Sequence, residues 1–289
     1  MKTLINITLV AFLSALTAQA QIVTDNLAQE LNADTIGAVT DGSTWTGTNV
    51  IADLHDNGSG LTRLAATVNG GQTSSVFENT LRGAYGLAET LGATAGPITG
   101  TTVSVELWVK TGFTGNPNVS QTIFETGGGG KGMTITLGNT GSGNNTLRFA
   151  LWSGGAGQVV DYTLDAAAMT NFTNDDHHQL AVTYDNLNTM KLYIDGAEVG
   201  SNIAAGVVDW DGSSGMGFWG RNGDMAFTSG LDSSGAGFGS IAVFRQYSVA
   251  LSSEDVLQNY NTTIVPEPSS AALLAGCFAL ASVMIRRRQ

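Results

Sequence analysis

The stretch HHQLAVTYDNLNTMKLYIDGAEV, residues His177–Val199, contains two runs in which apolar residues occupy every second position. These apolar residues are Leu180, Val182 and Tyr184 in the first run and Met190, Leu192 and Ile194 in the second. Such alternation predicts two β-strands that each bury one face, joined by a polar turn at residues 185–189. Asp195-Gly196 predicts a tighter turn with positive φ at both residues. Because a few strands cannot bury an apolar face alone, the stretch predicts a second sheet packed against the first.

Alternating runs elsewhere predict the remaining strands of an all-β protein. They lie at residues 103–109, 121–126, 133–137, 147–151, 158–164 and 240–247. Residues 21–60 are weakly patterned, and only edge strands and loops are expected there. One short helix is expected at Ser253–Asn259, with Ser252 as its N-cap and Asp255 completing a capping box. Together these patterns predict a two-sheet antiparallel sandwich.

The N-terminus has the pattern of a secretory signal. Lys2 precedes an apolar run over residues 4–16, and Ala18-Gln19-Ala20 fits the small-x-small pattern before a cleavage site. We therefore expect a signal peptide over residues 1–20, cleaved after Ala20. The apolar run is too short for a membrane-spanning first helix.

The C-terminal segment, residues 263–289, has three parts in a fixed order. They are Pro266-Glu267-Pro268, a mostly apolar stretch at residues 271–285, and the basic residues Arg286, Arg287 and Arg288. This arrangement resembles the bacterial PEP-CTERM sorting signal. The resemblance implies a transient hydrophobic helix in the inner membrane, recognition by an exosortase, and delivery to the cell surface or an extracellular polysaccharide matrix. As an anchor alone the helix would be weak, since fifteen residues rise only about 22 Å against a hydrocarbon core of roughly 30 Å.

Between these signals, residues 21–262 form one domain of ordinary size. With Lys2, the three terminal arginines and Glu267 outside it, 8 of the 12 basic and 23 of the 24 acidic residues remain, a formal charge of −15. A surface this acidic argues against nucleic acid or anionic lipid as a partner. The single cysteine, Cys277, lies in the C-terminal segment, so the domain has no disulfide and no cysteine metal site.

Three segments resemble the laminin-G-like proteins of the concanavalin A-like lectin/glucanase superfamily. They are VSVELWVK at Val103–Lys110, the HHQLAVTYDN and MKLYIDGAEV parts of the opening stretch, and GSIAVFRQYSVALSSEDVLQNY at Gly239–Tyr260. The resemblance spans roughly residues 100–260. It implies a jelly-roll sandwich, with His178 as a structural residue at the start of a strand.

No catalytic pattern accompanies this resemblance. Glycoside hydrolases on this fold carry carboxylates spaced as Glu-x-Asp-x-x-Glu, so that two of them flank the scissile bond. Glu106 and Glu125 are isolated instead. The adjacent His177 and His178 should point to opposite faces of a strand, so they cannot hold one metal ion together. We therefore expect no enzymatic activity.

Calcium is a candidate cofactor, because related proteins bind it through aspartates in loops and such oxygen ligands suit a hard cation. The acidic residues with this setting are Asp53, Asp56, Asp209, Asp211 and Asp232. The alternative is that they are solvated loop residues.

Tryptophans are the candidate ligand platforms, because an indole offers a flat apolar face to a sugar ring. Trp108 and Trp152 alternate against the aliphatic positions of their strands, and Trp210 and Trp219 lie in a loop-rich segment. Trp152, Trp210 and Trp219 are the predicted binding residues. The alternative is that such tryptophans fill a second small core.

These expectations describe a secreted, surface- or matrix-sorted binding or adhesion protein that engages an extracellular polysaccharide or surface glycoprotein. A polysaccharide hydrolase or lyase on the same fold, and a structural matrix protein without a small ligand, are the alternatives.

Overall fold

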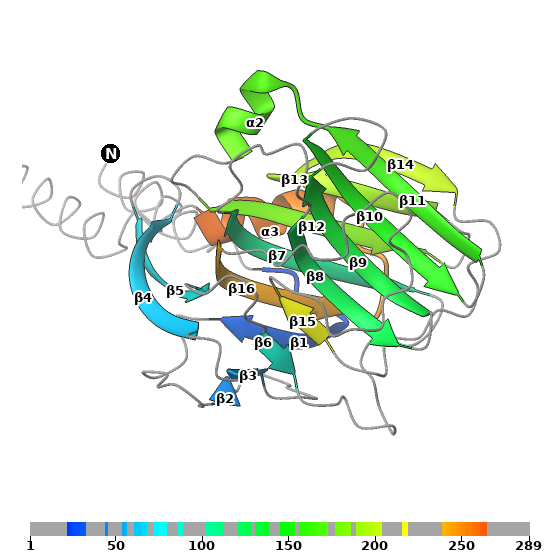
Figure 1. The fold of residues 1–289 in the computed structure, drawn as a ribbon. Helices are drawn as coiled ribbons and strands as arrows, with labels where there is room; N and C mark the ends of the chain where they lie inside the picture. Colours follow the sequence, from blue (N-terminus) through cyan, green and yellow to red (C-terminus); the bar gives the residue numbers. More distant parts are fainter. Residues whose placement is uncertain are drawn as a thin grey trace, which may run out of the picture.

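The computed structural model describes residues 22–32, 44–45, 54–56, 61–68, 72–79, 86–88, 102–111, 121–128, 131–138, 145–153, 156–172, 177–185, 189–203, 216–218 and 239–264. Within these residues the chain forms two antiparallel sheets packed face to face, with helices at their periphery (Figure 1). The predicted all-β sandwich is therefore confirmed.

The first sheet, sheet A, contains the strands of the opening stretch. In spatial order its strands are β14 (Ala197–Ile203), β13 (Thr189–Ile194), β12 (His178–Tyr184), β7 (Val103–Thr111), β16 (Gly239–Tyr247), β5 (Gln72–Asn79) and β4 (Leu61–Val68). A further strand, β1 (Leu27–Asn32), also pairs with β16. The chain order and the spatial order differ, as in a jelly roll, because β7 lies between β12 and β16.

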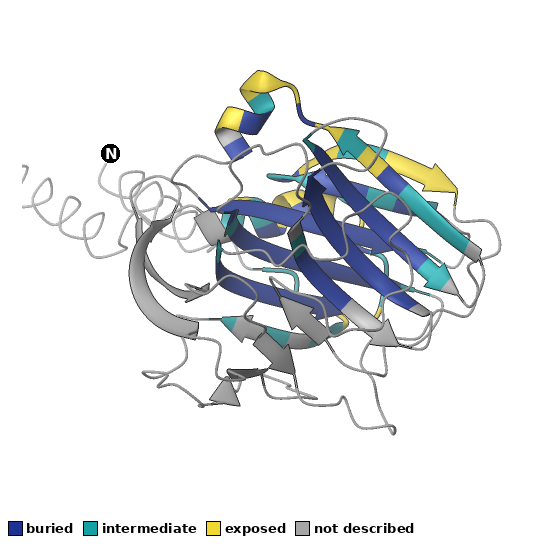
Figure 2. Ribbon diagram, in the orientation of Figure 1, coloured by how far each residue is buried: buried dark blue, intermediate teal, exposed yellow. Residues whose placement is uncertain are grey.

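The second sheet, sheet B, packs across from it. In spatial order its strands are β11 (Ala156–Thr163), β10 (Thr146–Ser153), β9 (Lys131–Gly138), β8 (Gln121–Gly128), β15 (Met216–Phe218), β6 (Gly86–Ala88), β3 (Leu54–Asp56) and β2 (Thr44–Trp45). Alternate residues of the two sheets meet between them, and Leu107 of β7 and Phe149 of β10 are both completely buried there. Figure 2 shows that β7 and β12 of sheet A and β9 and β10 of sheet B are buried along most of their length.

The opening stretch forms the predicted meander. Leu180 of β12 pairs with Ile194 of β13, and β13 pairs in turn with β14. Asp195 and Gly196, which connect the last two strands, have φ values of 50° and 77°. Both turn residues therefore have the positive φ that the Asp-Gly pair predicts.

The expected C-terminal helix, α3, runs over Ser253–Ile264 and is longer than predicted. Its capping box is present: the backbone N–H of Asp255 donates to Oγ of Ser252, and the backbone N–H of Ser252 donates to Oδ2 of Asp255, each at 3.1 Å. Satisfying these N–H groups fixes where the helix begins.

Two features were missed. Helix α2 (Ala166–Phe172) begins after Asp165, whose Oδ1 accepts a hydrogen bond from the backbone N–H of Ala168 at 2.8 Å. Its Met169 and Phe172 are buried against the main core. The hairpin of β4 and β5 was also not predicted. Neither described helix is long and apolar enough to cross a membrane; the predicted segment at residues 271–285 lies outside the described residues.

Candidate ligand-binding face

A two-sheet sandwich has two outer faces on which a ligand could lie. The outer face of sheet A is occupied by helix α3, which packs on Trp108, Tyr193 and Tyr247. The indole of Trp108 is 1% exposed and stacks on the ring of Tyr260, with 5.8 Å between the ring centroids and 8° between the planes. Trp108 points away from the main core, as predicted, but it fills a second small core beneath the helix and offers no platform to a ligand.

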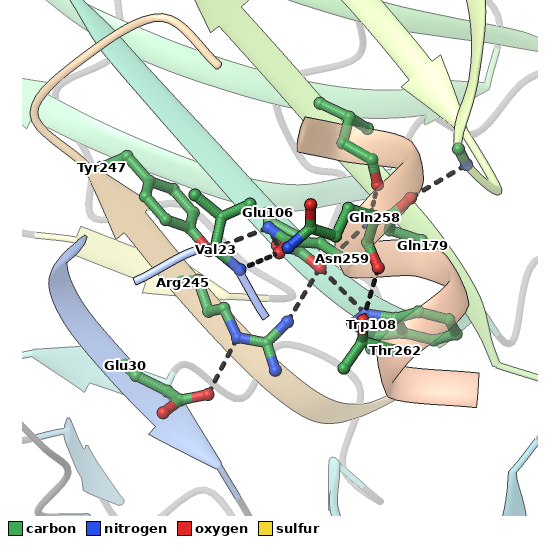
Figure 3. A network of polar contacts seen from close by, with 12 residues as sticks. Val23, Glu30, Glu106, Trp108, Gln179, Arg245, Tyr247, Gln258, Asn259 and Thr262 are labelled. Atoms are coloured by element: carbon green, nitrogen blue, oxygen red, sulfur yellow. Dashed lines mark hydrogen bonds and ion pairs between the residues drawn. The ribbon is translucent and has the colours of Figure 1, made fainter. Parts of the chain in front are cut away.

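A buried polar network holds α3 in this position (Figure 3). The carboxylate of Glu106, which is completely buried, accepts four hydrogen bonds. Its Oε1 accepts from Trp108 Nε1 at 3.1 Å, Gln179 Nε2 at 3.0 Å and Arg245 Nη1 at 3.0 Å. Its Oε2 accepts from Asn259 Nδ2 at 2.8 Å. Trp108 lies on the same strand as Glu106, and the other three donors come from β12, β16 and α3, so one carboxylate joins three strands and the helix.

The electrostatics of this network keep the guanidinium of Arg245 charged. Burial by itself lowers the pKa of Arg245, but the adjacent carboxylates of Glu106 and Glu30 outweigh burial and raise that pKa. Burial, followed by the charge of Glu106, raises the pKa of the Tyr247 phenol, so this hydroxyl stays protonated. A charged, fully hydrogen-bonded cluster with no exposed member at its centre is structural. The area of sheet A beneath α3 is therefore closed to ligands.

The outer face of sheet B is built from the alternate residues of its strands. Leu147, Phe149 and Leu151 of β10 point into the core, so Arg148 and Trp152 belong to the opposite face. In the middle of this face the side chains are buried, including Arg148. Towards edge strand β11 the face is more accessible: Trp152 and Val159 are half-buried and Asp161 is exposed. We call Arg148, Trp152, Gly157, Val159 and Asp161 the β10–β11 margin.

Trp152 has an unusual setting in this margin. Its partner in register on β9 is Gly132, and its partner on β11 is Gly157. Glycine is disfavoured within strands and often marks a place where another group approaches the backbone closely. The indole is thus flanked in register on both sides by glycine, which has no side chain.

Arg148 and Asp161 face each other across the same two strands and form a bidentate ion pair. Nε of Arg148 donates to Oδ1 of Asp161 at 2.6 Å, and Nη2 donates to Oδ2 at 2.7 Å. Paired side chains of this kind have fixed orientations, which suits recognition of polar groups. Glu125 of β8 belongs to the same face because it pairs with Thr134. Its strand is three steps from β11, so about 14 Å separates the two strands.

Comparison with known proteins identifies the family. A laminin G family model, described as the concanavalin A-like lectin/glucanases superfamily, matches residues 82–257. The chain belongs to this superfamily. Among curated proteins, none matches the chain in sequence.

Solved structures with a similar fold include toxin binding domains. The binding domain of botulinum neurotoxin serotype D has a TM-score of 0.55 and 16% identity, covering 83% of this chain and 52% of that chain. The binding domain of Paraclostridial Mosquitocidal Protein 1 has a TM-score of 0.56 and 13% identity, covering 83% and 52%. The serotype D ligand-binding domain in complex with N-acetylneuraminic acid has a TM-score of 0.54 and 15% identity, covering 87% and 53%. At these identities the similarity concerns the fold, and this superfamily member spans about half the length of those chains.

The two histidines of the opening stretch diverge in this superfamily member, as predicted. Nε2 of His177 lies 2.8 Å from Oγ of Ser240 on the outer side of sheet A, whereas Nδ1 of His178 lies 2.7 Å from Oδ2 of Asp195. Burial, followed by the charges of Lys110 and His178, lowers the pKa of His177 to about 4. Both rings join separate parts of the sheet, and neither is exposed enough to meet a substrate. The pairing of His177 with Ser240 was not foreseen, because 63 residues separate them.

Most of the predicted site residues lie outside the described residues. They are Trp210, Trp219, Asp53, Asp209, Asp211 and Asp232, together with Pro266, Glu267, Pro268, Arg286, Arg287 and Arg288 of the sorting signal. Asp56 lies in β3, whose side chains the structure does not describe. Within the described part of the superfamily domain, no three His, Cys, Asp or Glu side chains gather as a metal site would require. Calcium binding therefore stays a prediction.

Proposed function

We propose that this protein is a non-enzymatic carbohydrate-binding protein that holds a polysaccharide at the β10–β11 margin. One observation carries the proposal: Trp152 projects from the outer face of sheet B, half-buried, between Gly132 and Gly157. An indole held in this way can stack on the C–H face of a sugar ring. The ion pair of Arg148 and Asp161 on the same two strands supplies fixed polar groups for sugar hydroxyls.

The similar solved structures support a binding role. They include receptor- and ligand-binding domains, and one of these, a different protein, holds N-acetylneuraminic acid, a sugar with a carboxylate group. A fold can host many functions, so this support is general, and the local features of the margin make the proposal specific.

Two features of the margin support binding without catalysis. Both carboxylate oxygens of Asp161 accept hydrogen bonds from Arg148, which disfavours Asp161 as a nucleophile or general base. The other described carboxylate of this face, Glu125, is buried. The margin therefore lacks the paired carboxylates that glycoside hydrolysis uses.

The terminal segments suggest where binding takes place. The expected signal peptide at residues 1–20 would export the chain, and the PEP-CTERM-like segment at residues 263–289 would bring it to an exosortase-type enzyme in the inner membrane. The destination would be the cell surface or the extracellular matrix, where polysaccharide is abundant. Calcium bound by the loop aspartates would stabilise the loops and is proposed as an accessory.

Affinity gel electrophoresis in gels that contain polysaccharides, with and without calcium, tests this function. The protein should be retarded, and Trp152→Ala should abolish the retardation while the variant remains folded, as a cooperative melting curve would show. Leu257→Ala is the matched control, because Leu257 is a large apolar side chain, 47% exposed, on α3. It should leave the retardation unchanged.

The other outcomes distinguish the alternatives. Release of reducing sugar or of unsaturated products would identify a hydrolase or a lyase. Absence of retardation by every polysaccharide would favour a structural matrix protein.

A further inference from the structure

The charges around the β10–β11 margin restrict which polysaccharides can lie there. Four basic side chains are described in the structure, and three of them belong to sheet A: Lys110, Lys191 and Arg245. Arg245 is buried against Glu30 and Glu106, and Lys191 pairs with Glu198. Among these four side chains, Arg148 is therefore the one cation on the outer face of sheet B.

The charge of Arg148 is neutralised at close range. Asp161 accepts from two of its nitrogens at 2.6 and 2.7 Å, and the side chain of Arg148 is 7% exposed whereas that of Asp161 is 28% exposed. A ligand approaching from solvent thus meets the carboxylate before the guanidinium. Because a bidentate pair is among the strongest polar contacts in proteins, an incoming carboxylate or sulfate would have to break it to reach Arg148.

The rest of the margin is apolar or lacks side chains. Val159 of β11 pairs with Ala150 of β10, next to the Trp152–Gly157 pair. Apart from the carboxylate of Asp161, the margin therefore offers an indole, a valine and backbone, which bind through apolar C–H groups and hydrogen bonds. The net charge of the domain also favours an uncharged ligand, because residues 21–262 carry a formal charge of −15 and would repel a polyanion.

We infer that the margin binds uncharged polysaccharide and discriminates against glycans that carry carboxylate or sulfate groups. This inference rests on the proposed function, since it concerns the ligand class of the same site. Asp161 is then a specificity-determining residue: it cancels the charge that would otherwise attract an acidic sugar.

Polymers with the same backbone and different charge provide the test. The full-length protein is run in gels containing hydroxyethylcellulose or carboxymethylcellulose, and dextran or dextran sulfate, in buffers of low and physiological ionic strength. We expect retardation by the neutral member of at least one pair, and at least tenfold weaker retardation by its acidic partner at both ionic strengths.

Substitution of Asp161 tests whether the discrimination is local. Asp161→Asn removes one negative charge and replaces the carboxylate partner of Arg148 by a neutral amide, so retardation by the acidic partner should increase several-fold. Glu198→Gln is the matched control, because it removes the same charge from β14 on the other sheet. It should leave the ratio between the two polymers unchanged.

Each outcome decides a different claim. Retardation by acidic polymers alone, abolished by Trp152→Ala, would overturn the inference and leave the proposed function intact. Retardation by none of the polymers would overturn both. If Asp161→Asn and Glu198→Gln changed the ratio of retardation between the two polymers equally, the specificity role of Asp161 would be overturned. If Asp161→Asn does not fold, the polymer comparison on the unmodified protein still tests the inference.

Discussion

The backbone N–H of Val23 donates a 2.8 Å hydrogen bond to Oδ1 of Asn259, across 236 residues of chain. Nδ2 of the same asparagine donates to Oε2 of Glu106 at 2.8 Å and to the hydroxyl of Tyr247 at 2.9 Å. One completely buried side chain thus joins a segment near the start of the described chain, the sheet and the last helix. The start of the domain and α3 therefore stabilise one another.

Asn259→Ala should lower the free energy of unfolding by roughly 3 kcal/mol, because buried hydrogen-bonding groups that lose a partner cost about 1–3 kcal/mol each. Urea unfolding followed by tryptophan fluorescence measures the change. Asn261→Ala is the matched control, because Asn261 is exposed on the same helix and should change stability by less than about 0.5 kcal/mol. Equal midpoints for the two variants would contradict the role of Asn259.

Glu106→Gln should be more damaging than its size suggests. The substitution preserves the shape of the side chain but leaves the buried guanidinium of Arg245 with a weaker partner, and breaking a buried ion pair costs about 3–5 kcal/mol. We expect a loss towards the lower end of that range, since Glu30 remains beside Arg245. Glu198→Gln, which breaks the exposed pair with Lys191, should cost less than about 1 kcal/mol in the same urea experiment.

Local sequence patterns predicted the elements that depend on neighbouring residues. The alternation of Leu180 and Val182 predicted a strand, and Ser252 with Asp255 predicted the start of the helix; both are found. Asp165 before three alanines is an N-cap signal of the same kind, and attention to it would have revealed α2.

The Glu106 network could not be predicted, because its contacts are long-range. Its partners Gln179, Arg245 and Asn259 lie 73, 139 and 153 residues away in the sequence.

For the same reason, because burial depends on long-range packing, Trp108 and Trp152 look equivalent in the sequence. Both alternate outward from a strand, but the packing of α3 buries Trp108 and no local pattern specifies which face the helix covers. Accessibility is a property of the assembled layers, so sequence alone could nominate both residues but not choose between them.

The stability of the protein should fall between pH 6.5 and about 4 because of His177. Its pKa is lowered from 6.5 to about 4, so in this range the unfolded chain binds one proton more than the folded chain at this residue. Stability contributed by the neutral ring is complete above pH 6.5 and is lost as the pH falls, by up to about 1.4 kcal/mol per pH unit.

His177→Gln isolates this contribution from that of the carboxylates. Glutamine can still form a hydrogen bond with Ser240 but binds no proton. The free energy of unfolding of the variant should therefore fall less steeply between pH 6.5 and 4 than that of the unmodified protein. Urea unfolding at half-unit steps of pH measures both curves. Parallel curves would show that His177 does not contribute to the acid sensitivity.

Gly200→Ala should force the two sheets apart where β14 and β11 meet. A Cβ atom at Gly200 would lie 2.8 Å from Cγ1 of Val160, a buried residue of the core, and neither strand can yield without disturbing its sheet. Overpacking of this kind costs about 1–3 kcal/mol.

Val160→Ala alone should also destabilise the protein, because it leaves a cavity. The double variant should be more stable than the sum of the two losses predicts, since the new methyl group then occupies the space that the valine leaves. Additive losses in urea unfolding would contradict a direct contact between the two positions.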